Sequence, residues 1–137
     1  MAHALNRNEG VSSIHKLIEV AAKGRFRRFD GKSIESLKEH GYSMDEIHRF
    51  VAPRRTLARR IEKAESLTVS ENDSAQRLLN IAELAERILG DKERAQRWLR
   101  TPSRALNKVV PLDLLESETG ARLVEEELLR IEYGIYF

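Results

Sequence analysis

Apolar residues recur at intervals of three and four along almost the whole chain, and this periodicity restricts the fold to packed helices. Strand signals are sparse, since the best candidate, Val109-Val110, ends at once against Pro111. We therefore expect an all-α protein. The pattern predicts helices over residues 12–22, after Ser33, after Ser43, from Pro53 to about Glu65, over 71–89, between Asp91 and Thr101, and over 118–133.

Polar residues with the spacing of helix caps support these boundaries. Ser43 and Glu46 have the spacing of a capping box, in which each side chain accepts a hydrogen bond from the other residue's backbone N–H. Asp91 and Ser117 are suited to cap the last two helices. We expect Ser70 to cap the long helix over residues 71–89.

Length and composition exclude several classes of protein. The chain has 137 residues, of which 41% are hydrophobic and 34% charged, as in a globular protein of one or two small domains. It contains no cysteine, which excludes disulfides, thiolate zinc sites and cysteine nucleophiles. It shows no signal peptide and no apolar span of roughly 20 residues, so we expect a soluble, cytoplasmic protein without membrane contact.

Charge divides the chain into two parts. Residues 1–66 carry 14 basic and 9 acidic side chains, whereas residues 67–137 carry 10 and 13. A basic front and an acidic back favour an anionic partner for the first part and a different partner for the second. We expect a flexible N-terminus over 1–10, a first helical unit over 11–68 and a second over 69–137.

Residues 43–65 have the layout of a helix-turn-helix, in which a short capped helix leads through a tight turn into an arginine-rich helix. The first residues of such a second helix reach base edges in the major groove of DNA. The alternative is an exposed, solvated helix face, because the apolar residues of this helix need only one side buried. The turn at Phe50-Val51-Ala52-Pro53 lacks the usual glycine, which counts against DNA binding. The predicted buried stripe of this helix is Leu57, Ile61 and Ala64, and the predicted DNA contacts are Arg54, Arg55, Thr56, Arg59 and Arg60.

The segment from 93 to the end carries an ordered set of landmarks: Ala95, Trp98-Leu99, Pro102, Leu106, Pro111-Leu112, Leu114-Leu115, Gly120, Val124, Leu128, Ile131 and Gly134. This set resembles the C-terminal domain of Xre/MbcA/ParS-type antitoxins. The run RRTLARR at 54–60, with Leu67, Glu71 and Arg77, is similar to the preceding part of that family. The chain departs from the family at Asn107 and Lys108, where glycines are frequent.

The resemblance implies the antitoxin of a type II toxin–antitoxin system. Its partner would be a RES-domain toxin that degrades NAD, and the C-terminal domain would cover the toxin's active site. The helix-turn-helix would bind operator DNA and repress the operon, and the antitoxin would form a homodimer. Two other interpretations stay open: a stand-alone helix-turn-helix transcriptional regulator, and a scaffold that does not contact DNA.

The sequence ends on aromatic and apolar residues, which a soluble protein has little reason to leave in contact with water. We expect a partner protein to cover them, because such side chains are efficient interface anchors. The alternative is that they fold back onto the protein's own core, which is where we expect Trp98. The residues that we expect to bind the toxin are Arg130, Tyr133, Ile135, Tyr136 and Phe137.

Nothing in the sequence indicates an enzyme. The four histidines, at positions 3, 15, 40 and 48, do not form a pair with metal-ligand spacing on one helix. A glycine-rich phosphate loop and a serine nucleophile elbow are both absent from the sequence. We therefore expect no catalytic residues, no metal and no cofactor.

Overall fold

The computed structural model describes residues 14, 15, 18 and 34–134, and this part of the chain is helical without a β-strand. The prediction of an all-α protein is confirmed. The predicted flexible N-terminus and most of the helix predicted over 12–22 lie outside the described residues. The helices are α2 (Ile34–Glu39), α3 (Met44–Phe50), α4 (Arg54–Glu62), α5 (Val69–Leu89), α6 (Lys92–Leu99), the 3-10 helix η1 (Pro111–Glu116) and α7 (Glu118–Tyr133).

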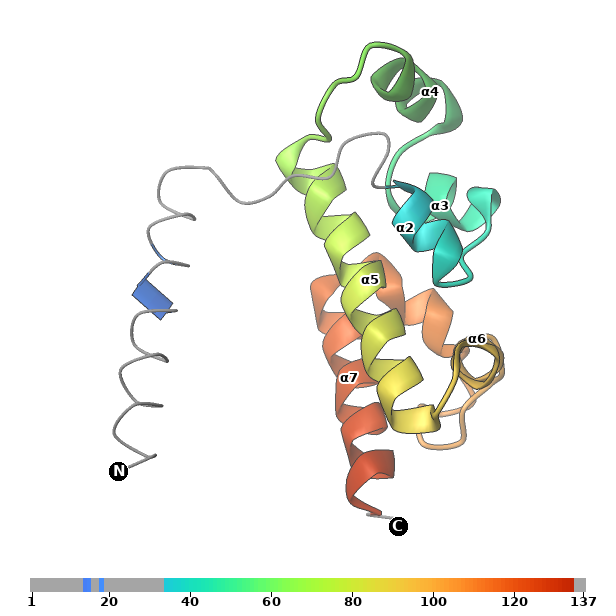
Figure 1. The fold of residues 1–137 in the computed structure, drawn as a ribbon. Coiled ribbons are helices and arrows are strands. Elements are labelled where there is room, and N and C mark those ends of the chain that lie inside the picture. The colour runs from blue at the N-terminus through green and yellow to red at the C-terminus, as the bar shows by residue number, and fades with distance from the viewer. Residues whose placement is uncertain (1–13, 16–17, 19–33, 135–137) are drawn as a thin grey trace.

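Helix α5 is the centre of the packing. It runs side by side with α7 in the same direction, and α2, α3, α6 and η1 also pack against it (Figure 1). Helix α4 lies beyond the N-terminal end of α5 and buries only Leu57 of its nine residues (Figure 1). Because α2 and α3 pack on α5, the predicted first and second units share one core, and the division between them at residue 68 stays a prediction.

The cap at the start of α5 differs from the prediction. Helix α5 begins at Val69, and its cap is Thr68, whose hydroxyl accepts a hydrogen bond from the Glu71 N–H at 3.2 Å. Glu71 accepts in return from the Thr68 N–H at 2.9 Å. Thr68 and Glu71 have capping-box spacing, so Thr68 displaces Ser70, which then lies in the first turn. The predicted caps Ser43, Asp91 and Ser117 are confirmed.

The end of α4 also differs from the prediction. The helix ends at Glu62, and Ala64 has a φ of +51°, in the left-handed region that ends helices. Ile61 is 49% exposed and Ala64 is exposed, so of the predicted apolar stripe only Leu57 is buried. Pro53 is the N-cap of α4 rather than part of its first turn.

The turn between α3 and α4 forms without a glycine. Val51 has a φ of −102° and a ψ of −63°, which any residue adopts, so the absence of a glycine causes no strain there. Val51 and Ala52 are both buried and join α3 to the core. The connection is therefore ordered, although it differs from a turn that passes through the left-handed region.

Side chains from distant parts of the chain close the core around α5. The Tyr42 hydroxyl donates a hydrogen bond to the Leu78 carbonyl at 2.7 Å, and burial raises the pKa of this tyrosine. Trp98 is half-buried and packs against the core, rather than lying fully inside it. At Gly120 an added Cβ would lie 2.0 Å from the Leu114 carbonyl oxygen, so only glycine lets the first turn of α7 approach η1 this closely.

Candidate functional site

The outward face of α4 carries two arginines. Arg55 and Arg59 are four residues apart and lie on the side of the helix opposite the buried Leu57, and both are exposed. Within the described residues no carboxylate forms an ion pair with either of them. Arg54 is also exposed and lies 3.5 Å from Asp45. Arg54 therefore pairs with a carboxylate, whereas Arg55 and Arg59 are free to meet an anionic partner.

Arg60 differs from the other predicted DNA contacts, because it faces the protein. Its side chain is only 13% exposed, and its Nε donates to Glu71 Oε1 at 2.8 Å while one Nη donates to the other Glu71 oxygen at 3.3 Å. The second Nη donates to Glu65 at 3.1 Å. The structure therefore joins Arg60 to the start of α5, away from Arg55 and Arg59, while Thr56 lies half-buried.

The Arg60–Glu71 pair shifts the pKa of both partners. Burial raises the pKa of Glu71, but hydrogen bonds from Arg60 and Thr68 outweigh burial and hold it below its usual value. The hydrogen bond to Glu71 in turn raises the pKa of Arg60. Spacing could have revealed this orientation, because Arg60 follows the buried Leu57 by three residues and shares its side of the helix.

The C-terminal end of α7 is the second candidate surface. Tyr133 is 72% exposed, so it does not fold back onto the core. Arg130 is exposed and pairs with Glu127 at 3.5 Å. Glu132 forms an ion pair with Arg87 of α5, which holds the end of α7 against α5. Ile135, Tyr136 and Phe137, which the sequence also assigns to the toxin surface, lie outside the described residues.

The two surfaces lie at opposite ends of the molecule (Figure 1). Helix α4 is at the N-terminal end of α5, and Tyr133 is beside the C-terminal end. Helix α5 has 21 residues and is therefore about 31 Å long. The two surfaces are therefore separated by about the length of this helix.

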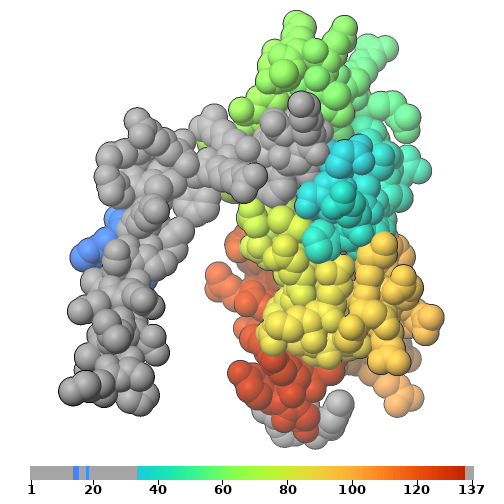
Figure 2. Space-filling view, in the orientation of Figure 1, coloured from blue at the N-terminus to red at the C-terminus, as the bar shows by residue number. Residues whose placement is uncertain are grey.

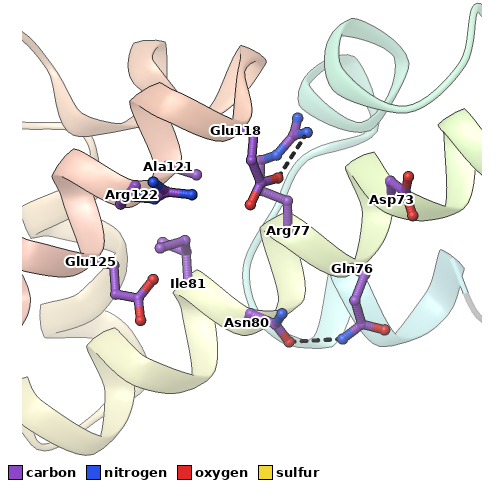
Figure 3. Close-up of a pocket in the computed structure, with 9 residues that line it drawn as sticks. All are labelled: Asp73, Gln76, Arg77, Asn80, Ile81, Glu118, Ala121, Arg122 and Glu125. Atoms are coloured by element: carbon purple, nitrogen blue, oxygen red, sulfur yellow. Dashed lines mark hydrogen bonds and ion pairs between the residues drawn. The ribbon is translucent and has the colours of Figure 1, made fainter. Parts of the chain in front are cut away.

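A groove of about 240 Å³ opens between α5 and α7, and sequence reasoning did not single it out. Arg77 lines it and donates to Glu118 of α7 at 3.4 Å (Figure 3) and to the Leu115 carbonyl of η1 at 3.4 Å, so it joins both elements to α5. Charges of both signs line the groove, and the described residues contain no group of His, Cys, Asp or Glu that could hold a metal ion. The lining residues are Asp73, Gln76, Arg77, Asn80, Ile81, Glu118, Ala121, Arg122 and Glu125.

Comparison with known proteins finds similarity over part of the chain. Residues 84–134 match the family model of the antitoxin Xre/MbcA/ParS C-terminal toxin-binding domain. Antitoxin Xre of Pseudomonas putida is 38% identical over 84 residues, covering 61% of this chain and 53% of that protein. Antitoxin Xre of Yersinia enterocolitica is 34% identical over 85 residues, covering 61% and 57%. The corresponding protein of Photorhabdus laumondii is 33% identical over 82 residues, covering 59% and 55%.

The chain spans about half the length of the curated relatives that it matches. Relatives named antitoxins agree with the expectation that the chain is not an enzyme. Among the described helices, none has the length and apolar content needed to cross a membrane.

Proposed function

We propose, from the premise that this chain carries the C-terminal toxin-binding domain of the Xre/MbcA/ParS antitoxins, that it neutralises a RES-domain, NAD-degrading toxin by covering the toxin's active site. The end of α7 and the residues after it would enter the catalytic pocket. The observation that supports this choice is Tyr133, a large aromatic side chain that is 72% exposed on a helix held to its neighbour by the Arg87–Glu132 pair. Exposed aromatic residues on rigid supports are efficient anchors in interfaces.

Co-expression with a RES-domain toxin tests this proposal. Deletion of residues 133–137, and separately Tyr133→Ala, is expected to restore toxicity, measured as loss of growth and of cellular NAD. Because Tyr133 is exposed at the end of α7, Tyr133→Ala removes no core contact. Glu126→Ala, at another exposed position of α7, is the matched control and is expected to neutralise normally. Full neutralisation by the deleted chain would contradict the proposal.

The same chain would repress its own operon by binding operator DNA through α4. Arg55 and Arg59 lie on the exposed face and are free to contact phosphates or guanine edges. The two-ended arrangement supports a repressor that holds its toxin at one end and DNA at the other, within a complex built on an antitoxin homodimer. A gel shift with the DNA upstream of the gene tests this: the wild-type chain should bind, and the Arg55→Ala/Arg59→Ala double variant should not.

The co-expression experiment and the gel shift together also distinguish a stand-alone regulator from an antitoxin. DNA binding without any neutralisation would favour the regulator, and neutralisation without DNA binding would favour an antitoxin that is not a repressor.

A further inference from the structure

Basic side chains in the acidic half of the molecule are concentrated in one segment. Residues 92–108 carry six basic side chains and one acidic one, whereas the remainder of 67–137 carries four basic and 12 acidic ones. The segment comprises α6 and the loop that follows it. The net charge of this segment is therefore positive, whereas the net charge of the rest of residues 67–137 is negative.

Five of these cations are exposed on α6 and on the loop that follows it, and we name them together the α6 basic surface: Lys92, Arg94, Arg97, Arg104 and Lys108. All five are exposed, and α6 shows on the outside of the molecule, away from α4 (Figures 1 and 2). Among the described residues only Arg94 has a carboxylate in ion-pair range, that of Asp91 at 3.7 Å. Helix α6 is held to the core by Ala95 and Leu99, which are fully buried and lie on the side of the helix opposite Arg97.

The loop holds one of these cations in an unfavourable backbone conformation. Asn107 has a φ of +57° and Lys108 a φ of +65°, both in the left-handed region. Asparagine tolerates this region, but lysine is strained in it, whereas glycine adopts the same backbone conformation without strain. The loop is nevertheless fixed, since the Lys108 N–H donates to the Ser103 carbonyl at 2.7 Å and the Ser103 N–H to the Val109 carbonyl at 3.0 Å.

Non-glycine residues in the left-handed region often lie at binding sites, where the surrounding structure holds them. Glycine at position 108 would relax the loop but would remove a positive charge from the α6 basic surface. The charge of Lys108 therefore comes at a cost to the backbone of the loop, and we take it as part of the α6 basic surface.

We propose that the α6 basic surface binds an acidic patch on the toxin, as a second contact beside the end of α7. This inference rests on the proposed function. A protein partner is favoured over nucleic acid because the surface lies within residues 84–134, which match the toxin-binding domain, and far from the arginines of α4. Val109, which is 38% exposed next to Lys108, adds apolar area of the kind found in protein interfaces.

Opposite charges across an interface act mainly on the rate of association and make it depend on salt. Lys108→Gly is therefore expected to raise the melting temperature of the free chain while slowing toxin association about threefold at low salt. The triple change Arg97→Ser/Arg104→Ser/Lys108→Gly should slow it about tenfold or more, with the difference disappearing in 0.5 M salt.

Asn107→Gly is the matched control, because it relaxes the neighbouring left-handed position without changing charge. It should raise the melting temperature and leave the association rate unchanged. Stopped-flow mixing with the RES-domain toxin at several salt concentrations measures both variants. Association of the triple variant at the wild-type rate at all salt concentrations would overturn the proposal. Slower binding of operator DNA, with unchanged toxin association, would overturn it in favour of a nucleic-acid surface.

A separate probe tests the α6 basic surface without the toxin, so that failure of this inference can be distinguished from failure of the proposed function. If the wild-type chain does not bind the toxin at all, the proposed function fails, and a deca-glutamate peptide then tests the surface itself. At low salt the peptide should shift the NMR amide signals of residues 104–109 in the wild-type chain but not in the triple variant. Absence of those shifts would reject the surface as a site for acidic protein segments.

Discussion

The opposite orientations of Arg55 and Arg60 on α4 predict different effects on DNA binding. A phosphate contact contributes about 0.9 to the slope of log affinity against log salt concentration. Between 50 and 200 mM salt, this amounts to about a 3.5-fold change in affinity for each contact. Arg55 faces outward and is exposed, so Arg55→Ala should lower the slope by about 0.9.

Arg60→Ala should weaken DNA binding without changing the slope. Arg60 is 13% exposed and bound to Glu71, so its loss would free α4 to move relative to α5 rather than remove a phosphate contact. Fluorescence anisotropy of a labelled operator duplex at 50, 100 and 200 mM salt measures both affinity and slope. A slope for Arg60→Ala reduced as much as that for Arg55→Ala would refute this account of α4.

Glu71→Gln is a second test, because the two possible roles of Arg60 predict opposite changes in DNA affinity. If Arg60 contacted DNA, releasing it from Glu71 would strengthen binding, whereas a positioning role predicts weaker binding because α4 loses its anchor. Asp45→Asn is the matched control, since it removes a carboxylate that pairs with Arg54 but is 90% exposed. Tighter DNA binding by Glu71→Gln than by this control would contradict the positioning role.

Three further predictions concern stability. Gly120→Ala should destabilise the fold by about 3 kcal/mol in urea unfolding, because the new Cβ would lie 2.0 Å from the Leu114 carbonyl oxygen. Ala64→Gly should stabilise it by about 1 kcal/mol in the same assay, because Ala64 has a φ of +51°. Burial raises the pKa of Tyr42 above its ordinary 10.0, so the free energy of unfolding should fall as pH rises above about 10, and Tyr42→Phe should remove that part of the fall. Equal slopes of stability against pH in both proteins would contradict this last prediction.

Periodicity and caps were sufficient to predict most of the helices. Ser43, Asp91 and Ser117 cap where expected, because their hydrogen bonds are local and depend only on sequence spacing. The predicted end of α4, near Glu65, was wrong. Alanine is a good helix former, but Ala64 adopts a left-handed conformation where the chain turns toward α5.

The surfaces were harder to predict, because they depend on the tertiary arrangement. The exposure of Tyr133 agrees with its expected role, and that role itself stays a prediction. The carboxylate that binds Arg60 comes from the start of another helix, and this contact depends on how α4 meets α5. The groove between α5 and α7 unites residues about 40 positions apart, such as Arg77 and Glu118, which no local pattern connects.

The claim that the end of α7 covers the toxin's active site is tested most directly by titrating the NAD-consuming activity of a RES-domain toxin with this chain. The wild-type chain should inhibit in competition with NAD, and Tyr133→Ala should raise the inhibition constant while leaving the melting temperature unchanged. A stable complex in which the toxin still consumed NAD at its full rate would contradict the claim.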